Sequence, residues 1–254
     1  MITAENPAVK VGLLGAKAWS DAVTLIRDDV PRDDEMRLLE WQAAGLVDDE
    51  GHLDGDWATA LKVTQDALKG AEVVSVYDGV VFSATLFVDG SQGTVVCVTA
   101  RGAYAGEGAT QVIDAVHPML EISSAPASEA WLLVRRVLPP LDQLRAHPRE
   151  ARPEEVTPVS LAGVELPDSM KASPEAFANH LLNLPTLPSA VVDALDPTAS
   201  VFLFSLDGSG GSVSTSSQAW ALGNRGLYRV DSRDATVAEV PVGDLGHQIV
   251  AVLA

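Results

Sequence analysis

Val88-Asp89-Gly90-Ser91-Gln92-Gly93-Thr94-Val95 determines how this chain of 254 residues is organised, because it reappears as Leu206-Asp207-Gly208-Ser209-Gly210-Gly211-Ser212-Val213. The two copies are 118 residues apart. In each, an Asp-Gly-Ser-x-Gly turn joins two runs of β-type residues, and its glycines supply the positive φ angles that a hairpin connection needs. We therefore expect two hairpins of adjacent antiparallel strands.

The similarity continues downstream in the same register. The offset of 118 residues, without a gap, also pairs Ala103 with Ala221, Gly108 with Gly226, Val112 with Val230, Glu121 with Glu239 and Val134 with Val252. The turn taken alone would indicate only shared turn chemistry. The continued register indicates an internal duplication.

Each copy is predicted to form an antiparallel meander followed by a helix. The predicted strands are Val73–Tyr77, Val80–Val88, Gly93–Thr99 and Met119–Ile122 in the first copy, and Ser200–Leu206, Gly211–Leu222, Gly226–Val230 and Thr236–Val240 in the second. One closing helix begins near Pro126, a residue suited to a first helical turn, and the other covers Asp244–Leu253. Their apolar faces are Ala130, Trp131, Val134, Val137 and Leu138 in the first helix, and Leu245, Ile249, Val252 and Leu253 in the second.

Helices are also predicted ahead of each meander. Asp34–Ala44 and Asp56–Leu68 form a helical hairpin before the first meander, and Pro174–Leu184 and Ser189–Leu195 form a shorter pair before the second. Gly45 ends the first of these helices, and Asp54 suits the N-cap of the next. The helical spacing puts Met36, Leu39 and Ala43 on one apolar stripe, and it turns Trp57, Leu61 and Leu68 inward.

These elements predict an α+β protein of two related halves in a quasi-twofold arrangement, with antiparallel meander sheets flanked by helices. The expected first half is 1–140 and the second half is 171–254. Segment 141–170 is rich in proline and charge and is predicted to be a linker or long loop. We expect the halves to share one sheet and to form one compact domain.

Composition limits the classes of partner. A net charge of −18 and a pI near 4.4 repel a phosphate backbone and an anionic membrane surface, so neither nucleic acid nor a membrane is an expected partner. The one cysteine, Cys97, lies in an apolar run and is expected to pack as a small hydrophobe. The N-terminus carries no basic leader with a long apolar stretch, which favours a cytoplasmic location.

No motif predicts catalysis, a cofactor or a metal. In the acidic stretch Asp48–Asp56, a calcium loop with Gly55 as its glycine would need a bidentate Glu where Leu61 stands. The glycine-rich turns lack a following Lys-Ser/Thr, and no Gly-x-Ser-x-Gly is present. The histidines do not sit four residues apart, which disfavours a helix-borne metal pair; they are His52, His117, His147, His180 and His247. His180 and His247 lie on predicted helices among apolar residues, which favours a structural role.

The tryptophans are predicted to be core or subunit-contact anchors, with an interface role open for some of them. They are Trp19, Trp41, Trp57, Trp131 and Trp220. We assign no catalytic, cofactor-binding, metal-binding or partner-binding residues from the sequence, and we expect a non-enzyme.

Two stretches resemble the EspG family of type VII (ESX) secretion. In Leu38-Leu39-Glu40-Trp41-Gln42-Ala43-Ala44-Gly45-Leu46-Val47-Asp48-Asp49-Glu50-Gly51-His52-Leu53, a helix runs into Gly-Leu-Val-Asp-Asp-x-Gly and then into a second helix, as in the early region of that family. The stretch Trp220-Ala221-Leu222-Gly223-Asn224-Arg225-Gly226-Leu227-Tyr228-Arg229-Val230, with the helix after it, is similar to the family's last strand-and-helix unit. The resemblance implies a quasi-twofold sheet with helical bundles.

The resemblance further implies a cytosolic chaperone, in an actinobacterial setting, that binds the apolar tip of a helical-hairpin secretion substrate and keeps it soluble before export. Two alternatives remain open at the level of sequence. One is an enzyme or small-molecule binder with its site between the halves, for which a deep pocket with convergent polar groups would be evidence. The other is a self-associating structural protein, such as a homodimer formed through an open sheet edge.

Overall fold

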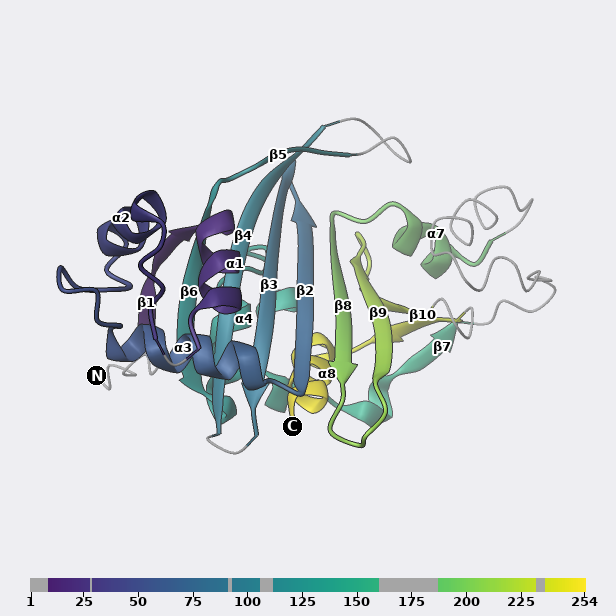
Figure 1. Cartoon of the computed structure of the whole chain (residues 1–254). Helices are drawn as coiled ribbons and strands as arrows, with labels where there is room; N and C mark the ends of the chain where they lie inside the picture. The colour runs from purple at the N-terminus through teal and green to yellow at the C-terminus, as the bar shows by residue number, and fades with distance from the viewer. Residues whose placement is uncertain (1–8, 28, 91–92, 106–111, 160–186, 232–235) are drawn as a thin grey trace, which may run out of the picture.

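The computed structural model describes residues 9–27, 29–90, 93–105, 112–159, 187–231 and 236–254. It is an α+β fold built on one antiparallel sheet of 11 strands, in the order β1-β6-β4-β3-β2-β8-β9-β10-β11-β7, with β5 paired to β4 beside this path (Figure 1). The prediction that both halves share one sheet is confirmed. The strands are β1 Val9–Gly15, β2 Lys69–Tyr77, β3 Val80–Asp89, β4 Thr94–Ala105, β5 Val112–Val116, β6 Met119–Pro126, β7 Thr157–Val159, β8 Ala199–Asp207, β9 Ser214–Leu222, β10 Leu227–Asp231 and β11 Thr236–Val240.

Helices lie on both faces of this sheet. They are α1 Ala16–Leu25, α2 Glu35–Ala43, α3 Gly55–Asp66, α4 Ala130–Arg135, α5 Asp142–Arg145, α7 Ser189–Leu195 and α8 Asp244–Leu253, with 3₁₀ turns at Ala127–Glu129, Pro148–Glu150 and Pro153–Glu155. None of the helices in the described ranges combines the length and apolar character needed to cross a bilayer.

The sheet order has a quasi-twofold symmetry about the junction of β2 and β8. These two central strands pair antiparallel, with Val73 opposite Leu203. Outward from the junction, the first half runs β3, β4, β6 and β1, and the second half runs β9, β10, β11 and β7. The helix that follows β6 is α4 and the helix that follows β11 is α8, so the connectivity of the two halves corresponds.

The gapless repeat register agrees with this symmetry where Glu121 of β6 matches Glu239 of β11, but it does not agree at the hairpin turns. By sequence, the turn ending at Gly93 matches the turn ending at Gly211, and both glycines have positive φ, 63° and 78°. These turns join β3 to β4 and β8 to β9, whereas the sheet order places the β8–β9 hairpin opposite the β2–β3 hairpin. The shared turn sequence therefore reflects hairpin chemistry, because a glycine in the left-handed region is what such a connection requires.

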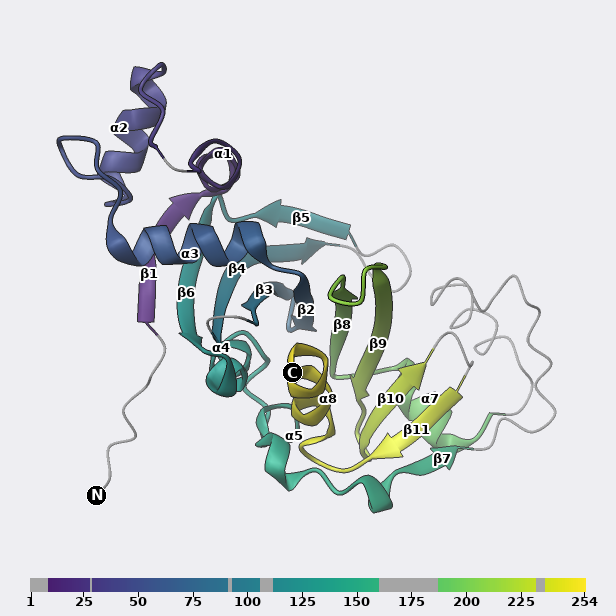
Figure 2. The same cartoon turned by 60° about the horizontal axis from the view of Figure 1, so that its bottom comes forward.

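Two main clusters of buried side chains form the core, one on each face. The larger lies between the sheet and helices α4 and α8, and it draws strands from both halves, with Val73, Leu86, Val201 and Trp220 among its members. On the other face, α1, α2 and α3 pack on β1, β6 and β4 of the first half. Figure 2 shows α3 and α8 on opposite sides of the sheet.

A third, smaller cluster lies under α7 on the same face as α3. Val191 and Ala194 of this helix pack against Ala221, Tyr228 and Val237 of the second half. Helix α7 precedes β8 as α3 precedes β2. The two helices thus flank the centre of the sheet on one face.

Most of the predicted strands and helices are present, and two predictions about helix faces are wrong. Met36, Leu39 and Ala43, the apolar stripe on α2, face solvent. Leu68 lies beyond the end of α3 and is 60% exposed, although it was expected to face inward. Strand β1 and helix α1 were not predicted, and the Pro174–Leu184 helix prediction lies outside the described residues.

The segment expected to be a linker contains structure that packs on the second half. Its strand β7 pairs with β11, with Pro158 opposite Ala238. Near its start, the backbone of His147 and Ala151 closes around Gly243, which has φ 86° at the N-terminus of α8. The division into 1–140, 141–170 and 171–254 stays a prediction.

Candidate protein-binding groove

A groove of about 600 Å³ lies over the junction of the two halves, on the α3 face of the sheet. Its floor is formed by β2, β3, β8 and β9, and one wall by the end of α3, at Thr64 and Ala67. In Figure 1 the central strands β2 and β8 are seen from this side, between α3 and α7. Among the described helices, neither α3 nor α7 extends over Phe204 and Leu206 of β8, which are 45% and 46% exposed.

The pleat of β8 explains why these side chains are open to solvent. Alternate residues of a strand point to opposite faces, and Val201 and Leu203 point into the large core under α8. Phe202, Phe204 and Leu206 therefore point to the α3 face. Strand β8 is apolar on both faces, but only one of its faces is covered by described parts of the chain.

A glycine deepens the floor. Gly70 of β2 lies between Phe87 of β3 and Leu206 of β8 in the pairing register. Because it has no side chain, the space between these two apolar residues stays open. A Cβ built on Gly70 would lie 3.0 Å from the carbonyl oxygen of Leu86, so this position also tolerates a larger residue poorly.

Lys69 lines the groove at the start of β2, and it contacts Asp207 of β8. Lys69 Nζ lies 3.8 Å from Asp207 Oδ2 across the β2–β8 pair. The hydroxyl and the backbone N–H of Ser209 donate hydrogen bonds to Asp207 Oδ1 at 2.5 and 2.8 Å, and they hold the pKa of that carboxyl below its usual value, with Lys69 contributing. At the groove's middle, Glu72 stands between Thr85 and Phe204 in register.

Few ionisable side chains line the groove. The ionisable side chains among the described lining residues are Lys69 and Glu72, and the lining contains no histidine or cysteine. Acid–base and nucleophilic mechanisms need a positioned pair of such groups within hydrogen-bond reach. An apolar floor with a polar rim is instead the anatomy of a surface that accepts an apolar segment of a partner.

The acidic stretch 48–56 forms a tight turn. Ligand atoms of Asp48, Glu50 and His52 lie within 4.8 Å of one another, and all three residues are exposed. Asp48 accepts hydrogen bonds from the backbone N–H of His52 at 2.7 Å and from its ring nitrogen at 3.1 Å, and the backbone bond is the main cause of the lowered pKa of Asp48. A bridge between Val47 and Leu53 closes the turn. These bonds account for the geometry without an ion.

The predicted burial of the histidines and of the tryptophans can be compared with the structure. His247 is exposed on α8, so the expectation of a structural histidine packed among apolar residues is wrong for it, and His180 lies outside the described residues. All five tryptophans are buried, as predicted for core anchors. His247 is exposed because it lies on the side of α8 opposite the buried stripe of Leu245, Ile249 and Leu253.

Sequence reasoning did not identify Phe204 and Leu206 as surface residues. The available signal was the run Val201-Phe202-Leu203-Phe204, which lacks the polar alternation of a strand with one wet face. That pattern predicts a strand buried on both faces. An exposed apolar face on such a strand indicates a surface that is covered by something else.

Comparison with known proteins bears on the fold. No protein-family model and no curated protein sequence matches the chain. Thirteen chains of solved structures match it. One is in the structure of the Mycobacterium tuberculosis type VII secretion system chaperone EspG5 in complex with the PE25-PPE41 dimer; the match has a TM-score of 0.50 and 16% identity, and covers 97% of this chain and 95% of that one.

The chain has an EspG-like fold. At 16% identity the likeness establishes the architecture and not the activity. The quasi-twofold sheet that the sequence resemblance implied is thus supported by the strand order and by this match.

Proposed function

We propose that this protein is a non-enzymatic, cytoplasmic protein-binding module of the EspG type, which holds an apolar segment of a helical secretion substrate in the groove between α3 and β8. The observation that carries the proposal is the exposed apolar row of Phe204 and Leu206 at the centre of the sheet. Solvent-exposed aromatic and aliphatic residues in a groove with a polar rim are typical binding anchors.

The fold adds support. The EspG5 chaperone, whose architecture this chain shares, was solved in complex with a protein dimer. A chaperone for a helical hairpin must cover the hairpin's apolar tip until export. It therefore needs an apolar surface of its own. The groove meets that physical requirement, and the net charge of −18 keeps the complex soluble.

The test is co-purification of the tagged chain with candidate helical-hairpin substrates, and the mass of the complex is measured in solution. We expect a stoichiometric complex that Phe204→Ser with Leu206→Ser disrupts by more than tenfold in affinity. Val116→Ser removes a similarly exposed apolar residue from β5 and should leave the complex intact. Recovery of the chain alone at full substrate expression would reject the proposal.

A small-molecule site is the second candidate, because the groove lies between the halves and its volume of about 600 Å³ is in the range of ligand pockets. Thermal-shift measurements with a metabolite panel distinguish a small-molecule site from a protein-binding groove. A ligand that stabilises the wild type and not the Phe204→Ser variant, without any protein partner, would favour this candidate.

A further inference from the structure

The exposed face of α2 is a second apolar surface. Helix α2 lies at one end of the molecule, away from the central strands β2 and β8 (Figure 1). Met36 and Leu39 are 77% and 53% exposed, and Ala43 continues the same stripe at helical spacing. Apolar stripes of this spacing ordinarily face a core. Here the described residues that pack on α2 contact its other face.

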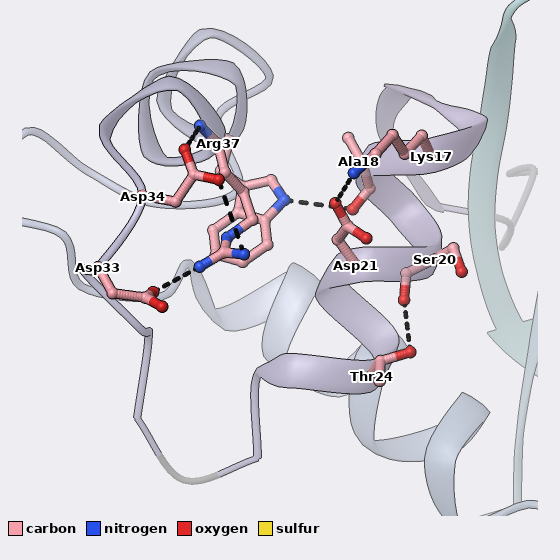
Figure 3. A network of polar contacts seen from close by, with 9 residues as sticks. Lys17, Ala18, Ser20, Asp21, Thr24, Asp33, Asp34 and Arg37 are labelled. Atoms are coloured by element: carbon pink, nitrogen blue, oxygen red, sulfur yellow. Dashed lines mark hydrogen bonds and ion pairs between the residues drawn. The ribbon is translucent and has the colours of Figure 1, made fainter.

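Contacts on the opposite face of α2 hold this helix against α1. Trp41 is fully buried, and its Nε1 donates a hydrogen bond to the carbonyl oxygen of Ala18 in α1 at 3.2 Å. The guanidinium of Arg37 lies 5.4 Å from the centre of the Trp41 ring. Arg37 also pairs with Asp33 at 2.5 Å (Figure 3). The apolar stripe is therefore held in place before any partner arrives, which lowers the entropic cost of binding.

A groove of about 490 Å³ runs along the stripe between α1 and α2. Its lining includes Met36 and Leu39 with Lys17, Asp21 and Glu40. Lys17 is paired with Asp21 at 2.5 Å, and Arg37 is paired with Asp33. Lys17 and Arg37, the two cations among the described lining residues, are thus both neutralised by carboxylates of the protein itself.

Carboxylates dominate the charge around the stripe. Residues 32–56 contain nine Asp and Glu against two Arg, so that −7 of the chain's −18 lies in this corner. Glu35 and Glu40 are exposed and flank the stripe, and Glu40 acts on Lys17 less than Asp21 does. An apolar stripe in a region with this excess of carboxylates favours a partner that is apolar and basic.

We propose that the α1–α2 surface binds a basic amphipathic helix of another protein. Apolar side chains of that helix, spaced three and four residues apart, pack on Met36 and Leu39, while Lys or Arg residues on its flanks pair with Glu35 and Glu40. The flexible thioether of Met36 suits contacts with partners of varied shape. This surface is separate from the groove over β8, so the two proposals stand or fall independently.

The test uses a fluorescent 18-residue peptide with leucine on one helical face and lysine on the other, and its anisotropy is titrated with the full chain. Met36→Ser with Leu39→Ser should weaken binding at least tenfold. Glu35→Gln with Glu40→Gln should weaken it severalfold and reduce its salt dependence. The substituted residues are exposed, so both double variants should fold, which circular dichroism checks.

Three controls locate the site. Val192→Ser removes an exposed apolar residue from α7, and Val116→Ser removes one from β5; neither should change the affinity for the peptide. The same peptide with glutamate in place of lysine should not bind. Equal binding of the lysine peptide to the wild type and to the Met36→Ser, Leu39→Ser variant would mean undirected charge attraction and would overturn the proposal, as would no binding at all.

Discussion

Trp220 in β9 and Asp244 at the first position of α8 are joined by a buried hydrogen bond, in which the indole Nε1 donates to Oδ2 at 2.9 Å. Arg229 of β10 completes the contact, since its Nη1 lies 3.0 Å from Oδ1 of the same carboxylate. One buried carboxylate thus ties two strands to the N-terminus of the C-terminal helix, where a negative charge is also favoured by the helix dipole.

Replacement of this carboxylate should be costly. Asp244→Ala leaves the indole N–H and the part-buried Arg229 without their acceptor, and we expect it to lower the free energy of unfolding by about 3 kcal/mol. Urea unfolding followed by circular dichroism measures the change. Asp66→Ala removes the acid of an exposed Lys62 pair and should alter stability little. Equal effects of the two substitutions would show that the buried position of Asp244 does not matter.

Gly243→Ala tests how the segment before β7 packs on α8. A Cβ on Gly243 would lie 2.6 Å from the backbone nitrogen of Ala151, and the residue has φ 86°. Gly45 has a similar φ of 71° with nothing within 4 Å of a built Cβ, so Gly45→Ala isolates the backbone strain. We expect about 1 kcal/mol of destabilisation at Gly45 and clearly more at Gly243. A smaller loss at Gly243 than at Gly45 would argue against this packing.

The thiol of Cys97 should be inert in the folded protein. It is 1% exposed, and burial raises its pKa to about 12, so almost none of the reactive thiolate exists near pH 8. A disulfide reagent monitored by absorbance should react slowly with the native chain and rapidly after denaturant is added. Rapid reaction without denaturant would mean that the strand β4 opens readily.

The sequence was sufficient for the strand meanders and the closing helices, because alternation and glycine turns are local signals. The sheet order could not be predicted in the same way. The matching turns at Gly93 and Gly211 suggested that two hairpins are equivalent, but these hairpins occupy different positions in the sheet. Strand β1 was missed because its pairing partner, β6, is more than a hundred residues away, as in Leu13 opposite Glu121. Exposure of Met36 and Leu39 could not be predicted, because a helical stripe has the same spacing whether a core or a partner covers it.

The neighbourhood of Tyr228 gives the last prediction, and it concerns alkaline pH. Asp193 of α7 accepts backbone hydrogen bonds from Asn224 and Arg225, both at 2.9 Å. Burial raises the pKa of Tyr228 to about 12, and its hydrogen bond to Asp193 adds to the shift, because the phenol must keep its proton to donate it.

Unfolded tyrosine ionises near pH 10, so between about pH 10 and 12 the folded state binds one more proton than the unfolded state, and stability must fall as pH rises. We expect Tyr228→Phe to flatten this fall and to remove a step near pH 12 from the absorbance titration of the phenols. Asp193→Asn should move that step toward lower pH, because the carboxylate no longer opposes ionisation. A titration in which Tyr228→Phe leaves the step near pH 12 in place would show that this step does not belong to Tyr228.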